Sequence, residues 1–538
     1  MTLFNLATLV LLGLWLVAIL RGLLAVLMLW QSKEYRFDRL RAHLETLQGR
    51  RQVMNGAAPL RVVFGLILCA LGVWGGALDQ VFYAVFIYYF IEFCLTVYWL
   101  KADKIKRPKL TVKTISLVAL TLLSLLLSAY LFFSTTGWAA LPLAHGLVGL
   151  WLSVWLILLK PINYWQKQQV FKKAALYRES LKHLTVIGIT GSYGKTSTKF
   201  FLSQILQSAG VSVIHSPGNT NTDIGLANFL LNNVTEAHSI FIAEMGAYRI
   251  GEIARAVSFL KPSIGVITAI NDQHVALFGS RANIMKAKYE LIEGLPKDGV
   301  AIFNDDDEAC RTMASWTNHV RVMRYSSHHG SDLSADSIRQ GKDKLEFTMR
   351  AKDVAVSVQA AVLGEHLTST FLAASACALV LGLTPQVIAR AATNIKVPAA
   401  TMELRKGLKG ATVIDDSYSA NPDGVAAALR LLKELPARRR LVVMRPMIEL
   451  GRYAAAAHRA LGEQLAESCD FAFFINQDFE QEIREGAGAR GMTPEKLIFE
   501  NDERRLASLI NDFVGPEDVI LLENRIPAKI KMLVTLSK

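Results

Sequence analysis

The sequence predicts two kinds of fold in one chain, a bundle of transmembrane helices followed by α/β domains. At 538 residues the chain is too long for a single hydrophobic core. Its mean hydropathy is +0.29 although 20% of its residues are charged, so one part must be much more apolar than the rest. A glycine-rich loop near residue 190 joins an apolar strand pattern to a helical pattern, which is typical of an α/β nucleotide-binding domain.

The charge balance is basic, with a net charge of +13 and a pI near 9.4. A nucleic-acid-binding protein would need these basic residues on one folded surface. Many of them instead lie between apolar runs in the first 180 residues, which is the pattern of membrane proteins. We therefore expect no nucleic-acid partner. The five cysteines are scattered and form no CxxC pair, which argues against disulfides and a zinc site: Cys69, Cys94, Cys310, Cys377 and Cys469.

Five apolar stretches are long enough to cross a bilayer as helices, at 3–30, 61–78, 81–100, 114–133 and 139–160. The first is too long for the core of a signal peptide and has almost no positive region before it, so it is interpreted as a span. The sequence thus predicts a transmembrane domain at 1–160.

The loops between these stretches predict the orientation. Segments 31–60 and 101–113 carry six basic residues each, whereas the connections at 79–80 and 134–138 carry none. Basic loops stay in the cytoplasm. The N-terminus is therefore expected outside, with the protein a multi-pass protein of the inner (cytoplasmic) membrane and everything after residue 160 in the cytoplasm, where ATP is found.

Two ionisable residues, Arg21 and Glu92, lie inside predicted spans, where charges are costly. They form a mutual ion pair or reach an interface, or else they line a polar pocket for a lipid-linked headgroup. Segment 35–52 reads as a basic amphipathic helix on the inner leaflet or as a solvated loop. We predict that Pro161 ends the last span and that 161–182 is a basic juxtamembrane linker.

The strongest motif is the phosphate loop that follows an apolar run at 184–188. Glycines at 188, 191 and 194 precede Lys195, Thr196 and Ser197, and a helical pattern follows. Glycines let backbone N–H groups close around phosphate oxygens, and the helix N-terminus adds a positive dipole end. Lys195 is expected on the β- and γ-phosphates, with the Thr196 hydroxyl on Mg²⁺.

Further blocks follow the loop in order, and with it the chain resembles the Mur ligase family, particularly the branch that adds a dipeptide to a muramyl tripeptide. The resemblance covers about 185–538. The blocks are GITGSYGKTSTK (188–199), SPGNTNTDIGL (216–226), AEMGAYRIGEI (243–253), ITAINDQHVALFGS (267–280), AKYE (287–290), FNDDD (303–307), GEHLTSTFLAASACALVLG (364–382), DDSYSANPDG (415–424) and IELG (448–451).

This resemblance implies ATP and two Mg²⁺ sites. Thr196 and Glu244 would hold one ion, and His274 would help to hold the second. Lys288 aligns with the family lysine that CO₂ converts to a carbamate, and Lys286 is the competing assignment. Lys195, His274 and Lys288 are the implied catalytic residues. The implied ATP contacts are Gly191, Ser192, Tyr193, Gly194, Lys195, Thr196, Ser197, Asn304 and Asp416, and the implied substrate contacts are Asn219, Asn221, Ser419 and Asn421.

The same resemblance divides the rest of the chain into a central ATP-binding domain at 183–398 and a Rossmann-like C-terminal domain at 399–538. Asn219 and Asn221 could instead be turn formers, since asparagine favours turns, and Asp416 could be a helix cap.

Some family positions differ. The asparagines that usually read adenine are replaced around His366 by Leu367 and Thr370. Thr401 stands in place of an arginine, for which Arg405 could substitute, and Arg445, Pro446 and Met447 replace a GDM element.

We therefore expect a membrane-anchored, ADP-forming ligase of cell-envelope (peptidoglycan) biosynthesis that joins the amine of an amino acid or peptide to a carboxylate through an acyl phosphate. Because the five spans occupy the place of the family's usual uridine nucleotide-sugar domain, the expected acceptor is a membrane lipid or a lipid-linked glycan, with other envelope-biosynthesis membrane proteins as partners. The alternatives are a soluble UDP-muramyl-tripeptide D-Ala-D-Ala ligase, a polyglutamate-type ligase, an ATP-gated transporter and a nucleotide-binding membrane scaffold.

Overall fold

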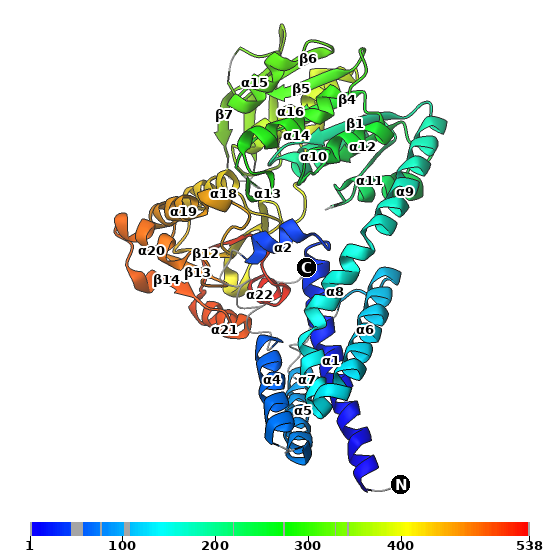
Figure 1. The fold of residues 1–538 in the computed structure, drawn as a ribbon. Coiled ribbons are helices and arrows are strands. Elements are labelled where there is room, and N and C mark those ends of the chain that lie inside the picture. The colour runs from blue at the N-terminus through cyan, green and yellow to red at the C-terminus, as the bar shows by residue number, and fades with distance from the viewer. Residues whose placement is uncertain are drawn as a thin grey trace. The chain divides into compact units, whose positions relative to one another are not determined.

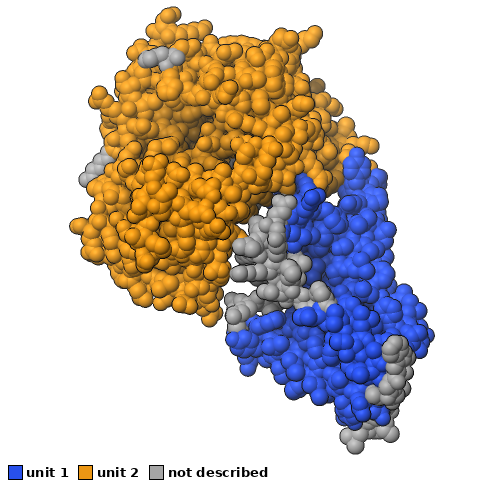
Figure 2. Space-filling view, turned by 60° about the vertical axis from the view of Figure 1, so that its left-hand side comes forward, with its two compact units in different colours: residues 1–166 blue, residues 167–538 orange. Residues whose placement is uncertain are grey.

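The chain folds into two compact units, residues 1–166 and 167–538, which Figure 2 shows in different colours. The structure is a computed structural model, and it describes residues 3–44, 58–75, 78–101, 108–218, 220–272, 275–328, 330–341 and 344–535. The described part of the first unit contains helices and no strands. The second contains two β-sheets with helices around them (Figure 1).

The helices of the first unit are α1 (Leu3–Ser32), α2 (Phe37–Leu44), α4 (Ala58–Gly75), α5 (Leu78–Lys101), α6 (Val112–Thr136), η1 (Gly137–Ala139), α7 (Ala140–Gly146) and α8 (Val148–Leu158). Their buried side chains form one apolar core, with Leu23, Val85 and Leu152 fully buried. Many large apolar side chains on the same helices stay exposed, among them Leu66 and Ile87. A water-soluble bundle would place polar residues on that outer surface.

Within the described residues, three helical segments are long and apolar enough to cross a membrane: Leu6–Ser32, Asp79–Lys101 and Val112–Gly146. A fourth crossing results if α8 and α9 (Lys160–Ser180), which meet at a 44° bend, count as one span. The described residues of the five predicted stretches are almost all helical. However, the apolar run of α4 that passes from Leu60 to Leu71 is short, and the stretch at 139–160 is divided among η1, α7 and α8.

The segment around Pro161 differs from the expectation. Pro161 was expected to end a span before a linker at 161–182, but it is the second residue of α9, which includes most of that segment. Proline fits the first turn of a helix because its missing N–H would have no helical partner there. The segment predicted as an amphipathic helix at 35–52 is helical over α2, and residues 45–52 lie outside the described part of the chain.

The central domain is built on a nine-stranded sheet with the order β2-β3-β1-β4-β5-β6-β7-β8-β9. The strands from β2 to β7 pair in parallel, and β7, β8 and β9 pair in antiparallel fashion. Their bounds are β1 (Thr185–Thr190), β2 (Val213–His215), β3 (Ile240–Glu244), β4 (Ile264–Ile267), β5 (Val300–Asn304), β6 (Arg321–Ser326), β7 (Leu333–Gln340), β8 (Leu345–Ala351) and β9 (Val354–Ala360).

Apolar side chains alternate between the two faces of this sheet, so each face has its own core. On β1, Val186 joins one core, and Ile187 and Ile189 join the other. The first face is covered by α11 (Asp223–Asn233), α12 (Glu252–Leu260), α14 (Arg281–Glu293) and α15 (Glu308–Trp316). The second is covered by α10 (Lys195–Ser208), α16 (Leu367–Val380) and α17 (Pro385–Ala392). A short helix, α13 (Val275–Phe278), precedes α14.

The C-terminal domain has a six-stranded sheet with the order β10-β11-β15-β12-β13-β14, parallel except for the edge strand β10. The strands are β10 (Glu403–Lys406), β11 (Thr412–Asp416), β12 (Arg440–Met444), β13 (Phe471–Phe474), β14 (Leu497–Phe499) and β15 (Val519–Glu523). The helices are α18 (Pro422–Glu434), α19 (Ala454–Ser468), α20 (Glu480–Ala489), α21 (Glu503–Phe513) and α22 (Ala528–Val534). The predicted α/β architecture of the second half is therefore confirmed.

Candidate active site

The phosphate loop connects β1 to α10, at the carboxyl edge of the central sheet. β1 lies between β3 and β4, so residues at the ends of these three strands meet around the loop. Gly191 has a φ of +146°, and a Cβ atom there would lie 2.1 Å from Thr268 Oγ1. Gly194, with a φ of +80°, caps α10. Both conformations favour glycine, and at Gly191 a side chain would also clash with Thr268.

The loop presents one lysine and the N-terminus of a 14-residue helix. Lys195 Nζ donates to the carbonyl oxygens of Gly191 (2.7 Å) and Ser192 (2.8 Å), so its ammonium group is held over the loop itself. The backbone N–H of Ser192 donates to Ala269 O (2.7 Å), which fixes the loop against the end of β4. Free N–H groups at the helix N-terminus and a positive charge beside them bind anions, phosphate in particular.

The metal-ligand candidates Thr196 and Glu244 are brought together. Glu244 ends β3 beside the loop and is 1% exposed, and its Oε2 accepts a hydrogen bond from Thr196 Oγ1 at 3.0 Å. Two adjacent ligands of an octahedral Mg²⁺ ion lie about 2.9 Å apart, because each is about 2.0–2.1 Å from the metal. The two oxygens therefore fit neighbouring positions on one Mg²⁺. Asn221, a predicted substrate residue, donates to Glu244 Oε1 at 3.2 Å.

Lys199 is a site residue that the sequence analysis missed. Its Nζ donates to Glu244 Oε2 at 2.8 Å, and both side chains are only 2% exposed. The signal was present in the sequence, because Lys199 follows Lys195 by four residues and so lies on the same face of α10. Its partner could not be found from spacing, since Glu244 lies 45 residues away.

The two lysines considered for carbamate formation are clearly different in the structure. Lys288 is buried in α14 (4% exposed), whereas Lys286 is exposed. Burial, followed by the positive charge of Lys195, lowers the pKa of Lys288 to about 7. A large part of this amine is therefore neutral near pH 7, the form that can add to CO₂. Glu290 in the same AKYE block accepts from the N–H groups of Gly251 (2.5 Å) and Ala254 (2.9 Å) and so caps α12.

The C-terminal domain reaches the phosphate loop at Asn271, and Tyr418 lies nearby. Burial raises the pKa of the Tyr418 phenol, and Glu244 and Thr196 are among the groups that influence it. Asn271 Nδ2 donates to Asn421 Oδ1 and Asp423 Oδ2, both at 2.9 Å, while the Asn271 backbone N–H donates to Ser192 Oγ (3.1 Å). Asn421 was predicted as a substrate residue, whereas Tyr418 and Asn271 were not singled out.

The remaining predicted residues have other surroundings. Asn304 is buried behind the loop, where it donates to Thr268 O (2.9 Å) and accepts from the N–H of Asp306 (3.0 Å). Asp416 is buried at the end of β11, and Met402 N donates to it at 3.1 Å. Ser419 is exposed. Asn219 and His274 lie outside the described residues, and among the described ones no group of three His, Cys, Asp or Glu side chains forms a metal site.

The structure shows the surroundings of Thr370, an altered family position, and of Arg405, the possible substitute for the arginine replaced by Thr401. Thr370 Oγ1 lies 3.8 Å from where a Cβ of Gly194 would be, so it borders the phosphate loop. Arg405 lies on β10, where it pairs with Glu403 (2.8 Å) and Asp415 (3.4 Å). Arg405 is thus held by carboxylates of its own domain.

A phosphate loop, a threonine–glutamate pair suited to Mg²⁺ and a buried lysine define a P-loop ATP-binding protein of the α/β class. The Mur ligase middle-domain model matches residues 189–378, and the model described as "Mur ligase, glutamate ligase domain" matches residues 402–523. The chain belongs to the Mur ligase family.

Named relatives agree with this membership. The UDP-N-acetylmuramoyl-tripeptide–D-alanyl-D-alanine ligase of Mycobacterium tuberculosis is 36% identical over 288 residues, covering 52% of this chain and 56% of that one. The ligase of the same name from Mycobacterium leprae is 33% identical over 369 residues, covering 63% and 71%. The crystal structure of MurF ligase from Thermotoga maritima in complex with ADP has a TM-score of 0.59 and 25% identity, covering 68% and 82%. The match to the M. tuberculosis enzyme thus spans a little over half of its length.

Proposed function

We propose that this protein is an ATP-dependent, ADP-forming ligase that forms an amide bond between an acceptor carboxylate and the amino group of an amino acid or peptide. The observation that carries the proposal is the contact of Thr196 and Lys199 with the buried Glu244 carboxylate, next to a phosphate loop. This arrangement places a metal-ligand pair at the helix N-terminus where the nucleotide phosphates bind.

The chain's own residues have separable roles in this reaction. The loop N–H groups and Lys195 bind and orient the phosphates. Thr196 and Glu244 would hold Mg²⁺, which screens the repulsion between the acceptor carboxylate and the terminal phosphoryl group when bound. Lys199 and Asn221 orient the Glu244 carboxylate from its two oxygens. Tyr418 and Asn271 bring the C-terminal domain onto the loop, which excludes water from the reacting groups.

For the substrates we propose those given in the relatives' names, a UDP-N-acetylmuramoyl tripeptide as acceptor and D-alanyl-D-alanine as amine. Identity of 36% and 33% to two such enzymes supports this choice over a polyglutamate-type reaction. The lipid-linked acceptor that we expected from the sequence has no support among these relatives, whose names specify a UDP-linked tripeptide.

We also propose that Lys288 carries a carbamate. The support is its burial, a pKa of about 7, and its position close enough to Lys195 and Glu244 to interact electrostatically with both. A carbamate would replace a cation by an anion at this point and so favour a second divalent cation. Incorporation of ¹³C-labelled CO₂, seen as a carbamate carbon signal that Lys288→Met loses and Lys286→Met keeps, tests this assignment.

For the location we propose that the apolar helices of the first unit cross the cytoplasmic membrane and that the ligase unit faces the cytoplasm. In the part of the chain that the structure describes, three helical segments satisfy the length and composition of a span, and a bent pair allows a fourth. Membrane proteins of envelope biosynthesis are the partners that such a location would bring close.

The decisive experiment measures ADP release and product mass with the full-length protein in detergent. With the UDP-linked tripeptide, D-alanyl-D-alanine and ATP, we expect amine-dependent ADP release and a product enlarged by one dipeptide. Lys195→Ala should abolish both, and Lys182→Ala, at an exposed lysine ahead of β1, should change neither. A wild-type protein that releases no ADP with this acceptor would contradict the substrate proposal, and no release with any amine or acceptor would favour a nucleotide-binding scaffold.

A further inference from the structure

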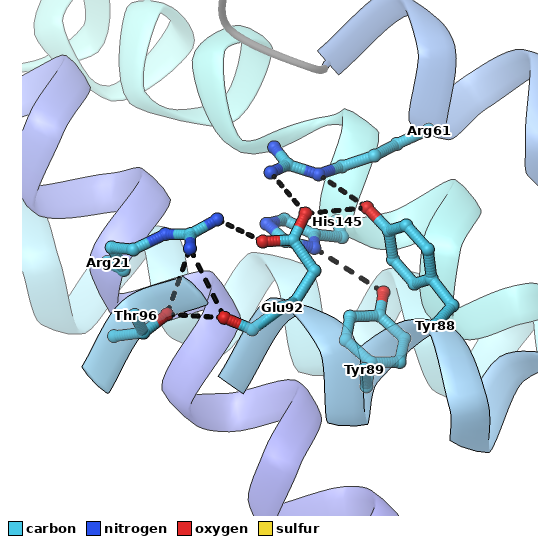
Figure 3. A network of polar contacts seen from close by, with 7 residues as sticks. All are labelled: Arg21, Arg61, Tyr88, Tyr89, Glu92, Thr96 and His145. Atoms are coloured by element: carbon cyan, nitrogen blue, oxygen red, sulfur yellow. Dashed lines mark hydrogen bonds and ion pairs between the residues drawn. The ribbon is translucent and has the colours of Figure 1, made fainter. Parts of the chain in front are cut away.

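A network of polar side chains lies inside the helical unit, far from the ligase site in the sequence. Figure 3 shows its members, which come from α1, α4, α5 and α7: Arg21, Arg61, Tyr88, Tyr89, Glu92, Thr96 and His145. Around it the core is apolar, with Leu23, Val85 and Leu141 buried. Polar groups in such surroundings are costly unless they are paired, and they usually serve a function.

Glu92 is the centre of the network. One of its oxygens forms an ion pair with Arg21, whose guanidinium also donates to Thr96 Oγ1 (2.9 Å). The other oxygen accepts from Arg61 (3.1 Å) and from the Tyr88 hydroxyl (2.9 Å), and Arg61 Nε donates to the same tyrosine (3.1 Å). The predicted ion pair between Arg21 and Glu92 is thus confirmed, and Arg61 is an unpredicted third member.

The charges of this network do not balance. Two guanidinium groups share one carboxylate, and all three side chains are only about one-tenth exposed. One arginine would suffice to neutralise Glu92. A second buried guanidinium carries a desolvation cost that the shared carboxylate offsets only in part. Among the described residues, the network therefore carries one positive charge that a further anion would balance.

His145 provides an independent observation. It is 1% exposed, and it interacts electrostatically with Arg61, Glu92 and Arg21. Its Nδ1 meets the Tyr89 hydroxyl at 3.4 Å, whereas its Nε2 is buried with no hydrogen-bond partner. When Tyr89 donates to Nδ1, the proton of the neutral ring is on Nε2. The network then contains an unused buried donor beside its excess positive charge, and both features suit an anion.

The position of the network indicates how such an anion arrives. Arg61 is in the first turn of α4, next to Leu60, which is 71% exposed, and Val63, which is 52% exposed. These surroundings suit a lipid, because its charged headgroup could contact the nearly buried arginine while its tail contacts the exposed apolar side chains. The planar guanidinium fork matches phosphate oxygens in two hydrogen bonds.

We propose that this network is a binding site for the phosphate headgroup of a lipid, with Arg61 as the principal contact and His145 as a second donor. The site takes a phosphate monoester carried on a hydrocarbon chain. The inference is independent of the proposed ligase function, because it rests on residues of the helical unit alone.

The test uses the full-length protein in phosphatidylcholine nanodiscs that contain a trace of farnesyl phosphate or phosphatidic acid, with the retained lipid counted by native mass spectrometry. We expect both phosphate lipids to be retained by the wild type. Arg61→Gln should reduce retention roughly tenfold or more, as expected for the loss of a charge-assisted hydrogen bond. Lys101→Gln removes one positive charge from the exposed end of α5 and is expected to behave as the wild type.

The choice of substitutions, with one further variant, protects the test against a folding failure. Arg61→Gln leaves Arg21 and Glu92 as a neutral pair, so the bundle should fold. Arg61→Lys keeps the charge but loses the fork and should retain an intermediate amount of lipid. Equal retention by the wild type and Arg61→Gln, or by the wild type and Arg61→Lys, would overturn the proposal. Inorganic phosphate that competes as well as the lipids would overturn the assignment to a lipid.

Discussion

Lys199 Nζ donates to Glu244 Oε2 at 2.8 Å across the interface between α10 and β3, and each of the two side chains is only 2% exposed. The same carboxylate oxygen accepts from Thr196 at 3.0 Å. One oxygen of Glu244 is therefore oriented by an ammonium group and a hydroxyl group together, beside the phosphate loop.

Replacing Lys199 by Met should damage both stability and activity. Removing one partner leaves a buried carboxylate without its counter-charge, which costs about 3–5 kcal/mol. We expect a lower thermal midpoint and slower ADP release. The matched control is Lys261→Met, because Lys261 pairs with Glu179 at a surface where both side chains are more than half exposed. Similar losses in the two variants would contradict the role given to the buried pair.

The phosphate loop should not tolerate a side chain at Gly191. Alanine there would place its Cβ 2.1 Å from Thr268 Oγ1, at a φ that L-residues rarely adopt. We expect Gly191→Ala to lose binding of a fluorescent ATP analogue. Gly488→Ala in α20 is the comparison, because beyond its chain neighbours and the backbone of its own helix no atom lies within 4 Å of the new methyl group. Retained nucleotide binding in Gly191→Ala would show that the loop adopts another path.

The two lysines of α14 provide an internal comparison for catalysis. Lys288→Met should reduce amine-dependent phosphate release to the background, because it removes the buried amine next to Lys195. Lys286→Met changes an exposed residue two positions earlier and should leave the rate unchanged. Loss of activity in Lys286→Met alone would favour the competing assignment.

The raised pKa of the Asp416 carboxyl group predicts that the stability of the folded protein depends on pH. Burial raises the pKa of its carboxyl group from 3.8 to about 7. The folded protein then holds this proton more tightly than the unfolded chain, so the stabilising contribution is complete below about pH 4 and is lost as the pH rises to about 7. We expect Asp416→Asn, which cannot ionise, to gain thermal stability relative to the wild type between about pH 5 and about pH 8. Asp353→Asn, at an exposed aspartate between β8 and β9, should show no such trend.

Much of the ligase unit could be predicted because its signals are local. The glycines, lysine and threonine of the phosphate loop are adjacent in the sequence, and the apolar strands of the C-terminal sheet alternate with helices. The contact of Lys199 with Glu244 could not be predicted, since it depends on the register that pairs Ile189 with Glu244. Periodicity also did not reveal β10, an edge strand whose alternating charges resemble a loop.

The helical unit shows a different limit of sequence reasoning. Hydropathy located its apolar stretches, and the rarity of charge within them identified Arg21 and Glu92. Arg61 was not singled out, because it lies at the very start of a predicted span, where a basic residue is ordinary. Only the packing of α4 against α5 and α7 shows that its side chain turns inward to Glu92.

The lysines around the phosphate loop have a consequence for the protein without nucleotide. Lys195 interacts electrostatically with Lys199, so two like charges are held close together within one small volume. Their mutual repulsion is relieved when a polyanion enters. We therefore expect bound nucleotide to stabilise this domain. The empty protein should be the more fragile state, and millimolar ATP or even pyrophosphate should preserve it during purification.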